Sequence, residues 1–335
     1  MNICLFVLLN LLFAPLKGDV DVVADNGGYI ANGRYVIPAG DHIVRITEEK
    51  GAWLTVGDNT ELIIDGNILL ESNDFRSCDI IRVTGRNVLV HGKGSIVGDK
   101  FTHTGTDGEW GMGINFRGAS NATLNGLTIK NCWGDCVYVG KKAGKVTIEN
   151  CLLDNGRRQG ISVTSADSVF VRNCTISNVQ GTNPQYAIDI EPNRNCTVNY
   201  VRLENVTATN CEGGFRALTY KVDERHAVVG SVEIRNCCVS AKSRYPIHLN
   251  QCKTVTVKEC SVYAHEKMSA IFARSVEKLN VSNNTLHLDS KRYRSVKNRG
   301  RKLVGKKEKS TIRLLDTSNE GVRNNRVVEK KNKFE

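Results

Sequence analysis

The chain has 335 residues, 40% of them hydrophobic, and its 46 Lys and Arg outnumber its 35 Asp and Glu to give a net charge of +11. One run, Lys291–Lys309, holds ten Lys or Arg and one Glu, so it carries +9 and leaves only +2 for the rest of the chain. This distribution argues against nucleic acid as a partner of the main body. We expect residues 291–309 to form a solvated basic loop insertion, or alternatively a contact for a polyanion.

The N-terminal region shows two local signals. Ile3–Ala14 is apolar, is too short to span a bilayer comfortably, and is followed by Pro15-Leu16-Lys17-Gly18, a pattern typical of a signal peptide. We predict a signal peptide over residues 1–18, export to the periplasm, the cell surface or the medium, and no later membrane span. Residues 19–50 contain Tyr35-Val36-Ile37-Pro38-Ala39-Gly40, which is typical of an entry strand and turn, and we predict an N-terminal cap there.

From residue 51 the chain repeats one phrase, Val-x-(Ile/Val)-x-Asn-Cys, as in Val146–Cys151, Val169–Cys174 and Val232–Cys237. The Asn or Gly position of this phrase returns mostly every 23 to 34 residues, at Gly66, Gly92, Gly126, Asn150, Asn173, Asn205, Asn236, Glu259, Asn283 and Asn324. A unit of this length, rich in β-branched residues and without helical periodicity, indicates an all-β solenoid. We predict about ten stacked coils over residues 51–328, with a frayed tail over residues 329–335.

Each coil contributes one strand with alternating apolar residues, which point inward because stacked coils share a single core. These pairs are Val146/Ile148, Val169/Val171, Val201/Leu203, Val232/Ile234, Val255/Val257 and Leu279/Val281. Asn tolerates the left-handed backbone of a turn, and stacked Asn side chains can bond to one another. The turn that ends each strand is therefore predicted to carry an Asn ladder.

Cysteine recurs directly after the ladder position, at Cys151, Cys174, Cys237 and Cys260. Because cysteine behaves as a small buried hydrophobe, we interpret these four residues as core packing. Disulfides between Cys132 and Cys136, or between Cys196 and Cys211, stay open at this stage because sequence alone cannot assign bridges.

A second strand precedes the first in each coil, and its inward pairs run from Ile114/Phe116 to Ile271/Ala273. The residue between the two members of each pair is expected to point outward and to stack with its counterparts. The resulting file is Asn115, Tyr138, Ser162, Asp189, Arg216, His248 and Phe272. Charged, amide and aromatic groups along a groove suit a sugar chain, whose hydroxyls need hydrogen bonds and whose rings need stacking.

The chemically richest part of this face spans three coils. Asp135 and Asp189 lie two coils apart, on the order of 10 Å, and side-chain reach can shorten this to the separation that acid and base catalysis of glycoside cleavage requires. Glu191 could replace either carboxylate. Arg157 or Arg158 would hold a carboxylate ionised or bind a substrate anion. Further substrate contacts are expected from Gln159, Tyr138 and Tyr186, and from Asn115, Ser162, Arg216 and His248 of the file.

These same residues carry a family resemblance. The strand order, the Asn ladder, Gly134-Asp135-Cys136-Val137 and Arg158-Gln159-Gly160-Ile161-Ser162-Val163 resemble right-handed parallel β-helix proteins of the pectin-lyase superfamily, distantly the polygalacturonase-type hydrolases. Arg-Arg-Gln-Gly-Ile-Ser with Ile-Asp-Ile-Glu-Pro-Asn also looks like exported bacterial and phage β-helix proteins. The resemblance implies a right-handed parallel β-helix acting on polysaccharide. Ile188-Asp189-Ile190-Glu191 stands where those hydrolases have Arg-Ile-Lys, which argues against galacturonan because carboxylate would face carboxylate.

We therefore expect an exported glycoside hydrolase with no cofactor, in which Asp135 is the acid or base. A polysaccharide lyase is the runner-up, with an Arg or Tyr138 as base and a Ca²⁺ held by Asp189 and Glu191. The alternative from another class is a non-catalytic, adhesin-like glycan-binding surface protein. Two structural interpretations also stay open: Asp135 could cap its own turn, and Asp189 and Glu191 could form a salt bridge with Arg157, Arg158 or Arg194.

Overall fold

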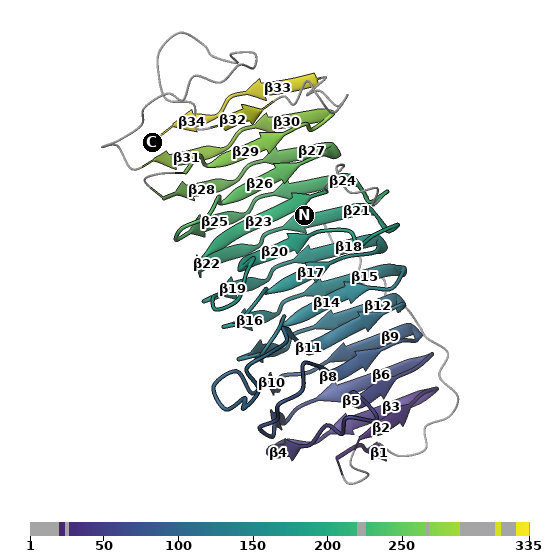
Figure 1. Ribbon diagram of the computed structural model, residues 1–335. Coiled ribbons are helices and arrows are strands. Elements are labelled where there is room, and N and C mark those ends of the chain that lie inside the picture. The colour runs from purple at the N-terminus through teal and green to yellow at the C-terminus, as the bar shows by residue number, and fades with distance from the viewer. Residues whose placement is uncertain are drawn as a thin grey trace, which may run out of the picture.

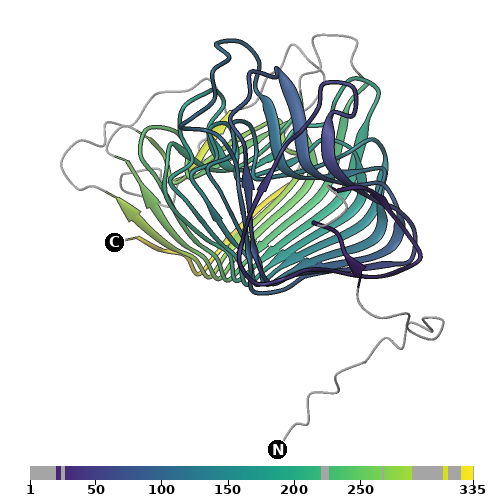
Figure 2. The same cartoon turned by 90° about the horizontal axis from the view of Figure 1, so that it is seen from below.

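The computed structural model describes residues 20–23, 27–219, 226–265, 268–288, 312–315 and 326–334, and all regular elements within these ranges are β-strands. The strands form three parallel sheets that run the length of a solenoid (Figure 1), and each coil adds one strand to each sheet. Viewed along the stack, successive coils superpose (Figure 2). The predicted all-β parallel solenoid is confirmed, and sheets of 12, 11 and 11 strands agree with the expected ten or so coils.

Sheet A contains the predicted Val-x-Ile strands, and Val146/Ile148 and its counterparts are buried in the interior. Its strands are β1 (Val20–Asp21), β3 (Gly33–Ile37), β6 (Thr60–Ile64), β9 (Arg86–His91), β12 (Ser120–Asn125), β15 (Ala143–Glu149), β18 (Ala166–Arg172), β21 (Thr197–Glu204), β24 (Val228–Arg235), β27 (Cys252–Lys258), β30 (Lys278–Ser282) and β33 (Arg326–Lys330).

Sheet B contains the predicted second strands, whose inward pairs from Ile114/Phe116 to Ile271/Ala273 are likewise buried. Its strands are β2 (Gly28–Ile30), β5 (Ala52–Val56), β8 (Ser77–Val83), β11 (Trp110–Arg117), β14 (Val137–Gly140), β17 (Ile161–Val163), β20 (Tyr186–Ile190), β23 (Gly213–Leu218), β26 (Ile247–Asn250), β29 (Ile271–Arg274) and β32 (Ile312–Leu315).

Sheet C was not predicted from the sequence. Most of its strands are three to five residues long and follow the ladder turn directly. They are β4 (Asp41–Val44), β7 (Asn67–Leu70), β10 (Ser95–Val97), β13 (Thr128–Lys130), β16 (Leu152–Asp154), β19 (Thr175–Ser177), β22 (Thr207–Cys211), β25 (Cys238–Ala241), β28 (Ser261–Ala264), β31 (Thr285–Leu288) and β34 (Lys333–Phe334).

The two ends of the chain differ in detail from the sequence prediction. Within the predicted cap, β2, β3 and β4 already pair with the next coil in all three sheets, so this region is the first coil of the stack. The tail that was expected to fray instead pairs through β33 with β30 and through β34 with β31. The predicted signal peptide and the basic run 291–309 lie outside the described residues. No helix that could span a membrane occurs in the described part.

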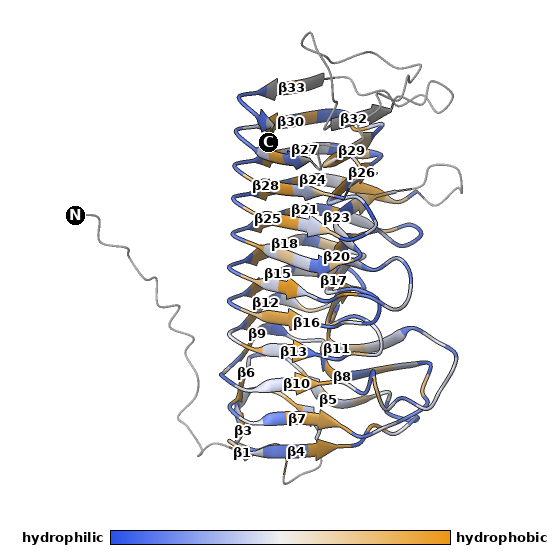
Figure 3. Cartoon of the chain, turned by 90° about the vertical axis from the view of Figure 1, so that its left-hand side faces the viewer, coloured by the Kyte–Doolittle hydropathy of each residue, from blue (hydrophilic) through white to orange (hydrophobic). Residues whose placement is uncertain are grey.

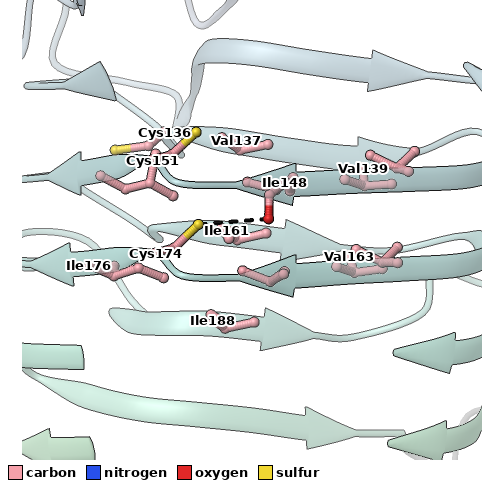
Figure 4. Close-up of a cluster of buried hydrophobic side chains, with 14 of the residues drawn as sticks. Cys136, Val137, Val139, Ile148, Cys151, Ile161, Val163, Cys174, Ile176 and Ile188 are labelled. Atoms are coloured by element: carbon pink, nitrogen blue, oxygen red, sulfur yellow. Dashed lines mark hydrogen bonds between the residues drawn. The ribbon is translucent and has the colours of Figure 1, made fainter. Parts of the chain in front are cut away.

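The core is a continuous apolar column, and the four ladder-adjacent cysteines belong to it, as predicted. Figure 4 shows Cys151 and Cys174 among Val and Ile side chains of neighbouring coils, with the thiol of Cys174 3.7 Å from the carbonyl oxygen of Ile148. All eleven cysteines of the described ranges are free thiols. The two candidate disulfides, Cys132–Cys136 and Cys196–Cys211, are therefore not present.

The predicted Asn ladder is confirmed at the turn between sheets A and C. Asn150, Asn173, Asn205 and Asn236 each donate from Nδ2 to the amide oxygen of the Asn one coil below, at 2.6–3.2 Å. All four have φ between 51° and 55°, the left-handed region that Asn tolerates. A second ladder, which the sequence analysis missed, joins Asn32, Asn59, Asn87 and Asn121.

Candidate functional site

The predicted outward file lies in one line along sheet B. Strand pairing aligns Asn115 with Tyr138, and then Ser162, Asp189, Arg216, His248 and Phe272, each one coil above the last. The expected open groove is not what surrounds it, because Asn115, Ser162, Asp189, Arg216 and Phe272 are all buried. Long loops project from the side of β8 and β11 (Figure 3). The file is therefore a hydrogen-bonded polar network with only some members open to solvent.

Asp135 lies in the turn just before β14, and its side chain is fully buried (0% exposed). Its Oδ2 accepts a hydrogen bond of 2.7 Å from the Ser162 hydroxyl one coil above, and the Arg158 Nη1 lies 3.3 Å from the same oxygen. Burial raises the pKa of the Asp135 carboxyl from 3.8 to about 6, against the opposing effects of Arg158 and Ser162. The carboxyl thus faces the next coil instead of capping its own turn.

Asp189, on β20, is held by three donors. Arg216 contacts it through Nε and Nη2, each at 2.7 Å from one carboxylate oxygen, and Gln159 Nε2 donates at 2.8 Å. The Gln159 amide oxygen in turn accepts from the backbone N–H of Tyr186 at 2.7 Å, which fixes its orientation. A salt bridge at Asp189 was one of the open interpretations, but its partner is Arg216 and not Arg157, Arg158 or Arg194.

Glu191 also contacts the Arg216 guanidinium, through Nη2. Its side chain is 29% exposed, so it is the most accessible of the three predicted carboxylates. A single arginine therefore lies between Asp189 and Glu191, at the place where the elimination alternative would put a Ca²⁺. Within the described ranges no group of three potential metal-ligating side chains gathers.

The two adjacent arginines have different surroundings. Arg158 lies between Asp135 and Glu109, with its Nε 3.4 Å from a Glu109 oxygen. Arg157 instead stacks on the indole of Trp133, 3.6 Å from the ring centroid, and its Nη1 donates to the backbone oxygen of Gly108 at 3.2 Å. Of the two predicted substrate-holding arginines, Arg158 contacts a carboxylate of the site, whereas Arg157 attaches the neighbouring loop.

Of the two tyrosines predicted to contact substrate, Tyr138 is partly exposed and Tyr186 is buried. Tyr138 is half-buried, and its hydroxyl bonds to Thr164 at 2.7 Å and Asn193 at 3.3 Å. Tyr186 is only 3% exposed, so it cannot be the stacking platform predicted from the sequence; burial raises its pKa to about 12. Its hydroxyl lies 3.1 Å from His248 Nδ1, and burial lowers the pKa of His248 to about 4.

The predicted residues thus form two adjacent contact clusters over four consecutive coils: Asp135 with Arg158 and Ser162, and Asp189 with Gln159, Arg216 and Glu191. Three further residues beside these clusters and beside Asn115 were missed. Glu109 comes from the loop before β11, which the repeat does not place. Asp79, on β8, contacts both Asn115 and Arg82: its carboxylate accepts from the Asn115 amide nitrogen at 2.9 Å and from Arg82 Nε at 2.6 Å. The register of β8 with β11 aligns Arg82 with Asn115, so extending the outward file by one coil toward the N-terminus could have found Arg82.

Proteins similar to this chain include two relatives and two solved structures. The SPbeta prophage-derived uncharacterized protein YorA of Bacillus subtilis (strain 168) is 26% identical over 187 residues, and the uncharacterized protein YclG of the same strain is 27% identical over 182. Both alignments cover 48% of this chain, but only 32% and 31% of the relatives. The matched part is thus about a third of each relative's length.

The mannuronan C-5 epimerase AlgE6 A-module of Azotobacter vinelandii superposes with a TM-score of 0.61 at 14% identity, covering 80% of this chain and 70% of that one. The tailspike protein of the E. coli bacteriophage HK620, solved with a pentasaccharide, gives 0.56 at 15% identity, covering 80% and 52%. The family described as "Right handed beta helix region" matches residues 65–223 and 112–286, which together exceed half of the chain. The chain therefore belongs to the family of proteins with a right-handed β-helix region.

Proposed function

We propose that this protein is an exported, polysaccharide-active enzyme that cleaves glycosidic bonds on the outer face of sheet B. The observation that carries the proposal is the different environments of two carboxyl groups of the site. Burial raises the pKa of Asp135 to about 6, so it keeps its proton at mildly acidic pH, whereas Asp189 pairs with Arg216 through two hydrogen bonds. Glycoside cleavage needs such a division between a proton donor and a carboxylate.

The separation of these groups is compatible with that chemistry. Asp135 and Asp189 lie two coils apart, on the order of 10 Å, with Ser162 on the coil between them and in contact with Asp135, and side-chain reach can shorten this separation. In this proposal Asp135 protonates the leaving oxygen, and Glu191, the more accessible carboxylate on Arg216, activates water. Asp189, itself held by Gln159, orients Arg216. The similar structures support a sugar-chain substrate only at the level of the fold.

Hydrolysis is favoured over elimination by the position of Arg216. A Ca²⁺-dependent lyase would need Asp189 and Glu191 free to bind the cation, but Arg216 contacts both. Tyr138, the candidate base, bonds through its hydroxyl to Thr164 and Asn193.

A second candidate function is non-catalytic glycan binding by a surface protein. It is favoured by the complete burial of Asp135 and by the three hydrogen bonds on Asp189, since a purely structural ion-pair network would look the same. The two functions differ in what the carboxylates do. Removing their charge abolishes cleavage in the first function and leaves glycan binding intact in the second.

The test incubates the protein with polymannuronate, polygalacturonate and bacterial capsular polysaccharides, and measures new reducing ends and absorbance at 235 nm. We expect reducing ends without 235 nm absorbance, and loss of this activity in Asp135→Asn. Asp167→Asn, on the exposed face of β18, is the matched control and should keep full activity. Glycan binding without turnover in the parent, unchanged in Asp135→Asn and Asp189→Asn, would establish the binding function instead.

A further inference from the structure

Trp110 is a large aromatic side chain exposed beside the candidate site. It begins β11 and its side chain is 44% exposed, although burying an indole would be favourable. Its chain neighbour Glu109 pairs with Arg158, which in turn contacts Asp135. The chain has only two other Trp residues, and neither is open in the same way: Trp53 is buried, and Trp133 is covered by stacking contacts.

The backbone around Trp110 packs directly against the turn that carries Asp135. Gly134 donates its N–H to the oxygen of Gly111 at 2.7 Å, and the N–H of Gly113 donates to the oxygen of Asp135 at 3.1 Å. A Cβ on Gly111 would lie 2.8 Å from the Cβ of Trp133, so only glycine permits this approach. The register of β11 with β14 pairs Ile114 with Val137, so Trp110 lies one coil toward the N-terminus from Asp135 and two residues earlier along the strand, about 8 Å away by backbone spacing and within two sugar rings.

The loop leading to Trp110 is firmly attached. His103 Nδ1 lies 2.7 Å from an oxygen of Asp99, and its ring stacks on Trp133 with centroids 3.9 Å apart. Arg157 contacts the same indole and holds the loop through the oxygen of Gly108. Because the support is rigid, a ligand that stacks on Trp110 loses little binding free energy to ordering of the protein.

We propose that Trp110 is the stacking platform of a substrate subsite one coil from Asp135, and that it takes the apolar face of a pyranose ring in the bound chain. The inference rests on the proposed glycan-directed function and adds the residue that determines where the chain lies. Aromatic rings bind the C–H face of a sugar, while the hydroxyls at the ring edge remain free for hydrogen bonds. Such a platform contributes to binding and not to the bond-breaking step.

The test compares Trp110→Ala and Trp110→Phe with Tyr263→Ala, a similarly exposed aromatic on sheet C. With whichever polysaccharide of the panel the parent binds, Trp110→Ala should weaken affinity about tenfold, equivalent to the stacking free energy, and raise KM with little change in kcat. Trp110→Phe should retain affinity within about threefold. Tyr263→Ala should match the parent.

Tryptophan fluorescence gives an independent readout that a fold defect would not imitate. Titration of the polysaccharide should change the emission of the parent, and this change should disappear in Trp110→Phe, whose circular dichroism and melting temperature should equal those of the parent. A parent that binds glycan while Trp110→Ala binds equally well overturns the platform and leaves the proposed function standing. A parent that binds no glycan of the panel overturns the proposed function, and the platform with it.

Discussion

Burial changes how single residues of the site titrate. Asp135 and His248 are both desolvated, and desolvation disfavours the charged form of each. For the acid this raises the pKa to about 6, and for the base it lowers the pKa to about 4. The same physical cause therefore makes opposite contributions to the pH dependence of stability.

Asp135 should reduce stability as the pH rises. The unfolded chain releases this proton near pH 3.8 and the folded protein near pH 6, so the free energy of unfolding falls between these values, by up to about 3 kcal/mol. Asp135→Asn removes this pH-dependent loss. Its free energy of unfolding, relative to that of the parent, should therefore be higher at pH 7 than at pH 4. Urea unfolding at both pH values measures this. An unchanged difference between the two proteins would mean that Asp135 is not desolvated as described.

His248 should have the opposite effect on stability, which it lowers as the pH falls. The unfolded chain takes up its proton near pH 6.5 and the folded protein only near pH 4, so the parent loses stability as the pH falls through this window. His248→Gln should therefore gain stability relative to the parent toward pH 4. The same urea experiment tests it, with the Asp135→Asn series as the internal contrast. A relative gain toward high pH would contradict this assignment.

Arg216 shows how one residue supports two carboxylates. Arg216→Met leaves Asp189 buried with Gln159 as its remaining side-chain donor, which should cost about 3–5 kcal/mol of stability. Adding Asp189→Asn removes the unpaired charge, so the double variant should recover much of that loss. Thermal and urea unfolding of the four proteins of this cycle provide the measurement. Equal stability of Arg216→Met and the parent would contradict the buried pair.

This pair was within reach of sequence reasoning. Asp189 and Arg216 were predicted to be neighbours in the same file, and strand pairing confirms that alignment. The open interpretation of a salt bridge at Asp189 nevertheless named only Arg157, Arg158 and Arg194 as partners, whereas the partner is Arg216 on the next coil. In a solenoid the residue one coil away is the closer one.

At the scale of elements, the turn between sheets A and C carries the strongest sequence signal. Four consecutive coils carry an Asn there, at positions 150, 173, 205 and 236, so the ladder followed from residue type and spacing alone. The strands of sheet C gave no such signal because a three-residue strand such as Leu152–Asp154 places a single residue, Leu153, in the core. One apolar position per coil cannot be distinguished from a turn by periodicity.

Asn173 is the element-scale test of the ladder. It donates to Asn150 at 3.2 Å, accepts from Asn205 at 3.0 Å, and has φ of 53°. Asn173→Ala loses both bonds and strains a left-handed backbone, which should cost about 2–3 kcal/mol. Asn173→Gly keeps the backbone relaxed and should cost about 1 kcal/mol less than the Ala variant. Chemical denaturation orders the three proteins. Equal losses for Ala and Gly would show that backbone conformation does not matter at this turn.

At the scale of the whole molecule, the strands of each coil pair only with those of the next coils, and a few side-chain contacts such as Tyr186–His248 reach two coils away, so stability is close to a sum of neighbour terms. Coils at the two ends have one neighbour and interior coils have two. Amide hydrogen exchange should therefore be slowest in central strands such as β15, β17 and β20 and fastest in β1, β33 and β34. Mass spectrometry of exchanged peptides measures this gradient. Uniform protection from end to end would indicate one indivisible cooperative unit instead.

The repeat along the whole molecule explains which features could be predicted from the sequence and which could not. Stacking, core pairs and the order of the outward file depend on a repeated register, and all of these were predicted. The loop before Trp110 occurs once and follows no repeat, and for that reason Glu109 was missed. Tyr186 was wrongly expected to be exposed, because its contacts with Arg216 and His248 come from later coils, and a groove was expected where most of the file is buried.

The measurement that tests the central claim most directly is the rate of glycan cleavage between pH 4 and pH 9, for the parent and for Asp135→Asn. If Asp135 is the proton donor, the parent rate falls as the pH rises through about 6, because the carboxyl must be protonated to act. Asp135→Asn should then lose turnover at every pH while keeping its fold. Cleavage by Asp135→Asn at the parent rate, with the same pH profile, would contradict the account.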